Sequence, residues 1–441
     1  MQRVVRRLLL IAVASTALAC AGRGETEVSK TALAHEKRPI EVALQFISGG
    51  PEELAPVLCG PEAGDLPATC DAMASHPQQF QFVDDVCRIK RWPLDDERDF
   101  ACPTSATSAD MTLSDGRIVH YRKAGEPIVY DDALREVIPE SVKLTVILVR
   151  RVNGVPHYRY VSNGTEGDVF QTWSSSKFMA IANAASTLRA RSGGALGLDA
   201  TVDQVPLGDL VTVVHNYDER HYTSNSLAKW FHDVGGRTHI NDLLHGWLGR
   251  PSSETLGGNY GPGFVGLGFN FRDTTGHTVT ISRDPGYSFD NRVSSQTMAE
   301  FLKRLVMHRE DAATRLPNLQ WSDLRVLFYG AESTKWFEGR PGGMSADRSV
   351  YMQLHDFDNI VKRSQGRFRI LSKSGMGYAQ YVHAGYACFP SLGSDGAPIA
   401  DEGREVIISA RVDTPAGYVE NDRVMARTYK TVMRMVMDGK I

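Results

Sequence analysis

The stretch WSSSKFMAIA, at residues 173–182, decides how the rest of the sequence is interpreted. Ser174 and Lys177 stand three residues apart, and on the first turn of a helix this spacing places them on one face. A serine hydroxyl keeps its proton at neutral pH, so it needs a base before it can act as a nucleophile. The apolar run 178–182 favours a desolvated, neutral amine on Lys177 that can take this proton. The stretch therefore predicts a nucleophile, Ser174, and its base, Lys177.

The S-x-x-K spacing alone is not specific, because roughly one or two chance matches are expected in a chain of this length. A second match runs from Ser226 to Lys229. Support for Ser174 comes from residues 373–375, which read KSG near the start of a strand pattern. A lysine and a hydroxyl on a strand edge suit a substrate carboxylate, and a glycine lets a substrate backbone lie close to the strand.

A third segment lies between these two and begins a predicted helix. Residues 222–228 read YTSNSLA, and the helix that they begin ends at the glycine pair 235–236. With the three segments in this order, the chain resembles the penicillin-recognising serine hydrolases, the family of class A β-lactamases and penicillin-binding D,D-peptidases. The family motifs are S-x-x-K, S-x-N and K-[ST]-G. The resemblance covers residues from about 140 to 441. The second S-x-x-K match, at 226–229, does not fit this order of motifs, because no S-x-N or T-x-N follows it before Lys373.

The resemblance implies a role for each motif residue. Ser174 would attack a carbonyl and form an acyl-enzyme, and Lys177 would be the base, directly or through water. Thr223, or else Ser224, would relay a proton to the leaving nitrogen, and Asn225 would bind the substrate amide. The middle motif is open between two registers, 223–225 and 224–226. The first is preferred because it places the following hydroxyl residue and the glycine pair nearer to the family's spacing.

The third motif would hold and polarise the substrate. The resemblance implies that Lys373 and Ser374 bind a substrate carboxylate beside Gly375, and that the backbone N–H groups of Ser174 and Met376 form the oxyanion hole. It requires no metal and no organic cofactor. The implied substrates are β-lactams or peptidoglycan stem peptides of the D-Ala-D-Ala type. The alternatives are a D,D-carboxypeptidase with slow deacylation, and a non-catalytic penicillin-binding or sensor protein.

The chain departs from class A β-lactamases in the loop that follows the helical region. Those enzymes activate the deacylating water with a glutamate in E-x-x-L-N, and here no glutamate occurs between Glu254 and Glu300. Asp273, Asp284 and Asp290 are the carboxylates of that interval, and Asp284, beside a Pro-Gly turn, is the first replacement to test. We therefore expect acylation to be faster than deacylation.

The order of the predicted elements indicates an α/β (α+β) fold. A strand hairpin over 144–161, turning at Asn153-Gly154, precedes a mostly helical region over 178–250 and a long loop region over 251–292. Three strand patterns follow, over 367–372, 378–389 and 405–412, and a helix over 421–437 closes the chain. An antiparallel sheet flanked by helices, with an all-helical subdomain, satisfies this order. We expect this β-lactamase/transpeptidase-like hydrolase domain to span 140–441.

The N-terminus has the pattern of an export signal. A basic segment, a short apolar run and the small residues before Cys20 resemble a lipoprotein signal over 1–20, followed by a polar tether over 21–30. We expect an exported protein of the cell envelope that a lipid on Cys20 anchors to the membrane; plain secretion is the alternative. No internal run is long enough to span a bilayer. The formal net charge of −3 gives no reason to expect a nucleic-acid partner.

An exported chain can hold disulfides, and four of its cysteines cluster in the sequence. Cys59, Cys70, Cys87 and Cys102 predict two bridges, with three possible pairings, in a small N-terminal module over 31–139. Their spacings lack the C-x2-C pair of zinc sites. Cys388 stands in an apolar strand pattern and is expected to be a buried free thiol.

Overall fold

The structure is a computed structural model, and it describes most of the chain after residue 101. The described residues are 102–441 without 217–220, 262, 264, 285, 287, 333, 335, 338–341, 347–356, 378–379 and 415–417. The predicted signal peptide, the tether and the cysteines before Cys102 lie outside this part.

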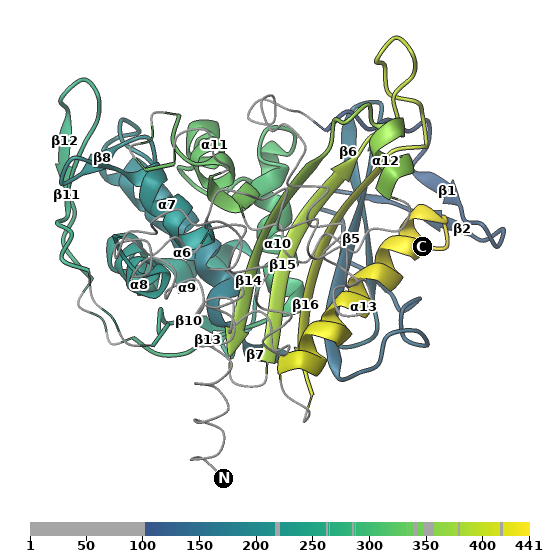
Figure 1. Cartoon of the computed structure of the whole chain (residues 1–441), viewed down its shortest axis with the longest axis horizontal. Coiled ribbons are helices and arrows are strands. Elements are labelled where there is room, and N and C mark those ends of the chain that lie inside the picture. Colours follow the sequence, from purple (N-terminus) through teal and green to yellow (C-terminus); the bar gives the residue numbers. More distant parts are fainter. Residues whose placement is uncertain are drawn as a thin grey trace, which may run out of the picture.

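A seven-stranded sheet forms the centre of the described chain (Figure 1). Its strands lie in the order β14-β15-β16-β5-β6-β3, with β4 also paired to β6. Their bounds are β3 Arg122–Lys123, β4 Tyr130–Asp131, β5 Val142–Val152, β6 Val155–Ser162, β14 Arg369–Gly377, β15 Gln380–Phe389 and β16 Arg404–Asp413. All pairs are antiparallel except β4 with β6. The two ends of the predicted domain therefore meet where β16 pairs with β5, as the element order indicated.

The hairpin of β5 and β6 forms for the reason that its sequence suggests. Asn153 and Gly154 both adopt positive φ, 51° and 79°, which a two-residue hairpin turn of the primed type needs and which these residue types tolerate. Val152 and Val155 pair directly across this turn. The β-branched residues of β5 are mostly buried, because both faces of the sheet are covered.

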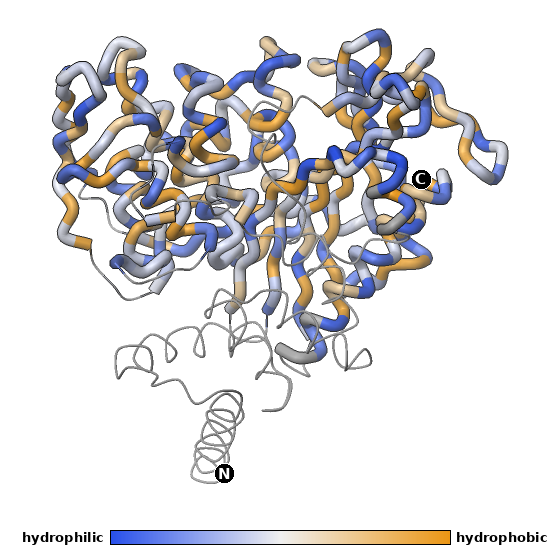
Figure 2. Tube along the Cα trace, turned by 45° about the horizontal axis from the view of Figure 1, so that its top comes forward, coloured by the Kyte–Doolittle hydropathy of each residue, from blue (hydrophilic) through white to orange (hydrophobic). Residues whose placement is uncertain are grey.

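Helices cover the sheet on both faces. Helix α13 (Tyr418–Met437) lies along one face, where Met425, Tyr429 and Val432 join a core with alternate residues of the strands. Helix α10 (Ser295–Val306) lies on the other face and joins the larger core. Figure 2 shows hydrophobic stretches alternating with hydrophilic ones along the tube. The antiparallel sheet flanked by helices confirms the predicted fold class.

Most of the remaining helices gather on one side of the sheet, where Figure 1 shows α6, α7, α8 and α11 together; α12 lies instead on the side of α13, and its Ile360 joins the core under that helix. Their bounds are η2 Trp173–Ser176, α6 Lys177–Arg191, α7 Leu207–Asn216, α8 Ser224–Gly235, α9 Arg237–Asp242, η3 Leu243–Trp247, η4 Ala312–Thr314, α11 Trp321–Tyr329, η5 Gly343–Ala346 and α12 Phe357–Arg363. Helix α6 is buried over most of its length, and α8 and α11 pack against it. This is the helical subdomain that the sequence predicted over 178–250, extended by α11.

Short strands form three small sheets beside the central one. The strands are β1 Asp110–Thr112 with β2 Ile118–His120; β10 Thr255–Leu256, β13 Asn291–Ser294 and β7 Val169–Gln171; and β12 Thr278–Thr280, β11 Asn270–Arg272, β8 Thr201–Val202 and β9 Val205–Pro206. Region 251–292, predicted as a long loop, thus contains three complete short strands and the start of a fourth. Strands β11 and β13 pair with β8 and β7 from earlier in the chain, which local sequence does not reveal, and β12 and β10 pair with β11 and β13.

The predicted boundary between residues 139 and 140 does not match the sheet. Strands β3 and β4 precede residue 140, yet both are hydrogen-bonded to β6. Leu134 and Ile138 are buried in the core under α13. Because these pairings join segments far apart in the sequence, the described residues before 140 belong to the same structural unit as the rest.

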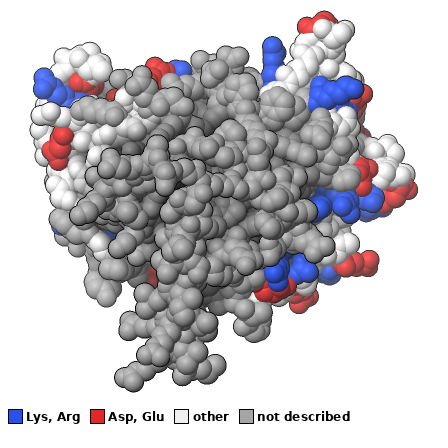
Figure 3. Space-filling model, viewed as in Figure 1, with Lys and Arg blue, Asp and Glu red and all other residues white. Residues whose placement is uncertain are grey.

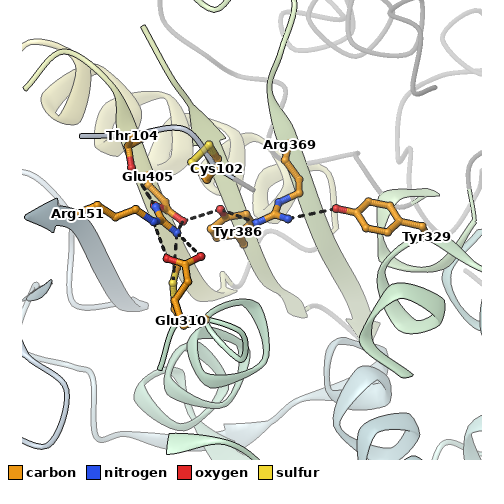
Figure 4. Close-up of a disulfide and its surroundings, with 10 residues drawn as sticks. Cys102, Thr104, Arg151, Glu310, Tyr329, Arg369, Tyr386 and Glu405 are labelled. Carbon is orange, nitrogen blue, oxygen red and sulfur yellow. Dashed lines mark hydrogen bonds and ion pairs between the residues drawn. A yellow bond between two sulfur atoms is a disulfide. The ribbon is translucent and has the colours of Figure 1, made fainter. Parts of the chain in front are cut away.

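Cys102 is disulfide-bonded as predicted, but the prediction of its partner within the N-terminal cluster was wrong, and so was the prediction of a free thiol at Cys388. These two cysteines form a disulfide with each other, with their Cα atoms 6.1 Å apart (Figure 4). The reason is that the chain after Cys102 runs beside the end of β5, where the amide of Ala106 donates to the carbonyl of Arg151. This places Cys102 against β15, which carries Cys388. Cys59, Cys70 and Cys87 lie outside the described residues, so their pairing stays a prediction.

A buried polar chain crosses the sheet near this disulfide (Figure 4). Arg151 forms ion pairs with Glu405 and Glu310, the latter at 2.7 Å. The hydroxyl of Tyr386 donates to Glu405 at 2.6 Å and accepts from Arg369 at 3.1 Å. Arg151 on β5 is paired with two carboxylates, and Arg369 on β14 donates to the hydroxyls of Tyr386 and Tyr329, so these buried charges have polar partners. We assign this chain a structural role.

The described residues visible in Figure 3 show charged side chains of both signs. In the described part of Figure 3, lysine and arginine side chains lie beside aspartate and glutamate. No helix among the described residues is long and apolar enough to cross a membrane. The same residues contain no group of three or more His, Cys, Asp and Glu side chains that could hold a metal ion.

Candidate active site

Ser174 lies on the 3₁₀ turn η2, directly before helix α6. The amide and the hydroxyl of Ser175 both bond the carbonyl of Thr172, at 3.1 and 2.6 Å, and close the turn. Ser175 and Ser176 are fully buried, whereas Ser174 is only partly buried. Of the three consecutive serines, Ser174 is therefore the one whose side chain a substrate can reach.

The residue before Ser174 has a strained backbone. Trp173 adopts φ of 51°, a left-handed conformation that a bulky side chain rarely takes. Two contacts hold it: its indole Nε1 donates to Gln380 at 2.8 Å, and its ring lies against Gly377, where a Cβ atom would come within 1.7 Å. Strain of this kind costs about 1–3 kcal/mol and persists only where neighbouring contacts enforce it. Strand β14 and the start of β15 thus fix the direction in which the turn presents Ser174.

Lys177 is the first residue of α6 and is completely buried. Its Nζ atom donates to the Ser224 hydroxyl at 2.9 Å and to the Asn225 side-chain oxygen at 2.6 Å. The structure thereby brings the first two predicted motifs together. Among the described residues, Nζ of Lys177 makes no hydrogen bond to Ser174; such contacts often tighten only when a substrate is bound.

The start of α8 gives the three candidate residues of the middle motif, Thr223, Ser224 and Asn225, different surroundings. Thr223 is the N-cap: it is exposed, and its Oγ1 accepts from the amide of Ser226 at 3.1 Å. Ser224 is buried, and its hydroxyl donates to the carbonyl of Val214 at 3.0 Å while it accepts from Lys177. The serine and the asparagine that lie at Lys177 are therefore Ser224 and Asn225. The sequence did not reveal this, because it depends on which residue caps the helix.

The KSG segment lies on β14, which is the edge strand of the central sheet. A Cβ atom at Gly375 would lie 2.4 Å from the amide nitrogen of Ser175 and 2.8 Å from that of Ser174. Only a glycine allows the strand to approach the serine turn this closely. Met376, the predicted second donor of the oxyanion hole, follows directly. The third motif therefore meets the first.

Lys373 and Ser374 are both fully buried and lie on opposite faces of the sheet. Nζ of Lys373 donates to the carbonyl of Ser374 at 3.0 Å, on the face toward α6. Ser374 pairs across the strands with His383, whose ring bonds Tyr429 of α13. Joint binding of a carboxylate by these two side chains stays a prediction.

Asp284, the first replacement base to test, is bonded to the backbone at the start of α9. Asp284 accepts from the amides of Arg237 and Gly286, at 2.6 and 2.7 Å, and so fixes the start of α9. These backbone hydrogen bonds, with Arg237 nearby, lower its pKa although partial burial opposes this. Its own amide bonds Asp233, near the C-terminal end of α8, whereas the contact with Lys177 is at the N-terminal end. Nine or ten residues of helix span about 14 Å, so Asp284, the first replacement base to test, lies far from Lys177 along α8.

Glu254 also has a structural role. It is completely buried, and its oxygens accept from the amide and the hydroxyl of Ser294, the N-cap of α10, at 3.2 and 3.1 Å. Arg250 donates to it at 3.3 Å. Glu254 thus joins this loop to the helix that follows it.

Sequence reasoning missed the aromatic side chain that does lie at Lys177. The ring centroid of Tyr260 is 5.3 Å from Nζ of Lys177, and the Tyr260 hydroxyl lies 3.2 Å from Oγ of Ser176. The missed residues also include Trp173 and Gln380, described above. Tyr260 carries no local signal, because a lone aromatic residue in a glycine-rich loop has no pattern that connects it with a lysine 83 positions earlier.

No family model matches the sequence, and no curated protein matches it. Solved structures give three instructive matches. A β-lactamase from Sphaerobacter thermophilus is 14% identical and aligns over 70% of this chain and 94% of its own, with a TM-score of 0.35. A β-lactamase from Burkholderia vietnamiensis is 13% identical over 69% and 93%, with a TM-score of 0.34. PBP-A is 12% identical over 70% and 97%, with a TM-score of 0.36.

Proposed function

We propose that this protein is a serine acyl-transfer enzyme that forms an acyl-enzyme at Ser174. One observation carries the proposal: three distant segments converge on the turn of Ser174. Lys177 bonds Ser224 and Asn225 from α8, and Gly375 of β14 packs against the amides of Ser174 and Ser175. Nucleophilic acyl transfer needs an accessible serine, a base beside it, hydrogen-bonding side chains and a backbone edge that can hold the substrate, and these are the parts that meet here.

The first half of the proposed reaction follows from these positions. The Ser174 hydroxyl attacks the carbonyl carbon of an amide, and its proton passes to Nζ of Lys177. The carbonyl oxygen becomes an oxyanion, which the amides of Ser174 and Met376 stabilise. When the carbon–nitrogen bond breaks, the proton returns from Lys177 through a hydroxyl to the leaving nitrogen, and an ester on Ser174 remains. Ser224 is the relay that we favour, since it contacts Lys177; Thr223 is the alternative.

The substrates that we propose are β-lactams or D-Ala-D-Ala peptides, in the manner of a class A β-lactamase or a D,D-peptidase. Both present an amide carbonyl with a carboxylate nearby, and Lys373 with Ser374 would supply the site for that carboxylate. Region 255–299 contains no glutamate, and both Asp284 and Glu254 are engaged elsewhere. Slow hydrolysis of the ester is therefore expected. A penicillin-binding sensor that is acylated without turnover is the second candidate. The engagement of Asp284 and Glu254 elsewhere favours it as well.

We further propose that the protein acts in the cell envelope, held there by a lipid on Cys20. The support is the lipoprotein-type sequence before that cysteine. Mass spectrometry of the N-terminal peptide from membrane fractions tests this: a diacylglyceryl group on Cys20 is expected, and an unmodified cysteine would exclude the anchor.

Covalent labelling tests the proposed activity. A fluorescent penicillin should label the intact protein within minutes, and peptide mapping should place the adduct on Ser174. Ser174→Ala should abolish labelling, whereas Ser252→Ala, a change of an exposed serine, should not alter it. A chromogenic cephalosporin followed in the same samples separates an enzyme from a sensor. An adduct on another serine, or no adduct at all, would refute the proposal.

A further inference from the structure

The loop between β10 and β11 places one aromatic side chain against the proposed base. The ring centroid of Tyr260 lies 5.3 Å from Nζ of Lys177, within the roughly 6 Å over which an aromatic face attracts a cation. Tyr260 is 8% exposed and Lys177 is 0% exposed. This attraction is stronger where water is excluded, so the burial of both groups increases its effect.

Hydrogen bonds at the far end of the ring fix its position. The Tyr260 hydroxyl lies 3.2 Å from Oγ of Ser176 and 3.4 Å from Nε2 of His232. Ser176 belongs to the same turn as Ser174 and accepts from the hydroxyl of Thr172 at 2.7 Å. The phenol is therefore bonded to the nucleophile's turn on one side and to α8 on the other. These bonds orient the phenol, and the packing of the ring, which is 8% exposed, keeps it beside Lys177.

The backbone of the loop is built for this placement. Gly258 has φ of 76°, and a Cβ atom there would lie 2.8 Å from the ring of His232. The side chain of Asn291 accepts from the amide of Gly258 at 2.8 Å and donates to the carbonyl of Asn259 at 3.0 Å. Asn291 also bonds the amide of Thr172 through its own carbonyl. One buried asparagine thus ties the loop that carries Tyr260 to the segment that carries Ser174.

We infer that Tyr260 is a positioning residue of the proposed reaction, whose ring stabilises the ammonium that Lys177 becomes when it takes the proton of Ser174. This inference rests on the proposed function. The charge appears on Nζ as Oγ bonds to the carbonyl carbon, and the ring face already lies beside that atom. Ser224 and Asn225 hold the same ammonium from the opposite element, α8.

The groups around Lys177 allow this effect to be measured through pH. Burial raises the pKa of the Tyr260 hydroxyl, and burial lowers the pKa of His232 to about 3, with Arg237 adding to the decrease. Neither group carries charge between pH 5 and 10. Lys373 is the buried cation on the face of β14 toward α6. Since Tyr260→Leu leaves His232 and Lys373 in place, a change in its pH profile reports on the loss of the ring.

The experiment compares acylation of the intact protein by a fluorescent penicillin from pH 5 to pH 10. In the pH profile of the acylation rate constant, Tyr260→Leu should lower the plateau about three- to tenfold. It should also shift the acid limb of this profile, where the rate rises as Lys177 loses its proton, to lower pH by about half to one unit. Tyr260→Phe keeps the ring and should retain the wild-type profile. Tyr158→Leu, a change of a buried tyrosine elsewhere in the same core, is the stability control and should leave the limb in place.

A second measurement keeps the inference separate from the proposed function. Titration of the lysine amino groups by NMR should place the pKa of Lys177 lower in Tyr260→Leu than in the wild type, whether or not penicillin reacts. Tyr260→Met serves if the leucine variant does not fold. An unchanged Lys177 titration overturns the inference, and so does an acid limb that Tyr260→Phe moves as far as Tyr260→Leu does. Absence of labelling in the wild type, with the NMR shift present, would refute the proposed function alone.

Discussion

Replacing Gly375 by alanine should slow acylation strongly while the protein remains folded. The added Cβ atom would lie 2.4 Å from the Ser175 nitrogen, 2.7 Å from the Thr172 oxygen and 2.8 Å from the Ser174 nitrogen. All three are backbone atoms of the turn that presents the nucleophile, so no flexible side chain can move aside. Strand β14 and this turn must therefore move apart.

The size of the effect follows from the contact distances. The closest contact, 2.4 Å, must lengthen by about an ångström to reach an ordinary van der Waals separation. A misplacement of this size costs about a hundredfold in rate, equivalent to about 2.7 kcal/mol in the activation free energy. Overpacking costs about 1–3 kcal/mol of folding stability. The variant should thus remain folded while its acylation rate constant falls by about two orders of magnitude.

Stopped-flow acylation with a fluorescent penicillin measures the rate, and urea unfolding measures the stability of the same samples. Gly246→Ala is the matched control, because a Cβ atom there meets nothing within 4 Å and the residue lies in the helical turn η3. It should acylate at the wild-type rate with unchanged or slightly raised stability. If Gly375→Ala also acylates at the wild-type rate, the close approach of β14 to Ser174 does not matter for the reaction.

Three further predictions concern the disulfide, the relay and pH. Cys388→Ser should cost about 2–5 kcal/mol of folding stability, and non-reducing peptide mapping of the wild type should recover Cys102 joined to Cys388; recovery of either as a free thiol would contradict the structure. Ser224→Ala should lower acylation at least tenfold, whereas Thr223→Ala should mainly cost about 1 kcal/mol of stability as a lost cap; the reverse ranking would make Thr223 the relay. The unfolded imidazole of His232 binds a proton near pH 6.5 and the native one only near pH 3. Stability therefore falls as pH decreases through this window, by about 2 kcal/mol between pH 7.5 and 5. His232→Asn should remove that part of the decrease, and urea unfolding with an unchanged pH slope would show that the native imidazole titrates normally.

Local chemistry made much of the fold predictable. Asn153 and Gly154 are among the few residues that tolerate positive φ, so the hairpin of β5 and β6 could be inferred from two letters. The closing strands and α13 have patterns whose periods of two and 3.6 residues are set by the backbone itself. The prediction of region 251–292 failed because the strands β10 to β13 are too short to show a period.

For the candidate site, too, some features could be predicted from the sequence and others could not. The spacing of Ser174 and Lys177, and their order relative to the segments 222–228 and 373–375, could be read directly. The role of Gly375 could also be anticipated, since a glycine on a strand suggests close backbone approach. Asp284 was misjudged because its neighbouring Pro-Gly turn showed only that it lies in a turn. Its position at the end of α8 opposite to the contact with Lys177 is a matter of helix packing.

The sequence by itself determined which residue types are available for catalysis and which segments are helix or strand, because both depend on local chemistry and local periodicity. Tertiary structure decided which groups meet. It placed Ser224 and Asn225, rather than Thr223, at the amine of Lys177, paired Cys102 with Cys388 across a sequence separation of 286 residues, and brought Tyr260 against the proposed base. Such contacts depend on how the helices, the sheet and the loops pack together, and a pattern within one segment holds no information about its distant neighbours.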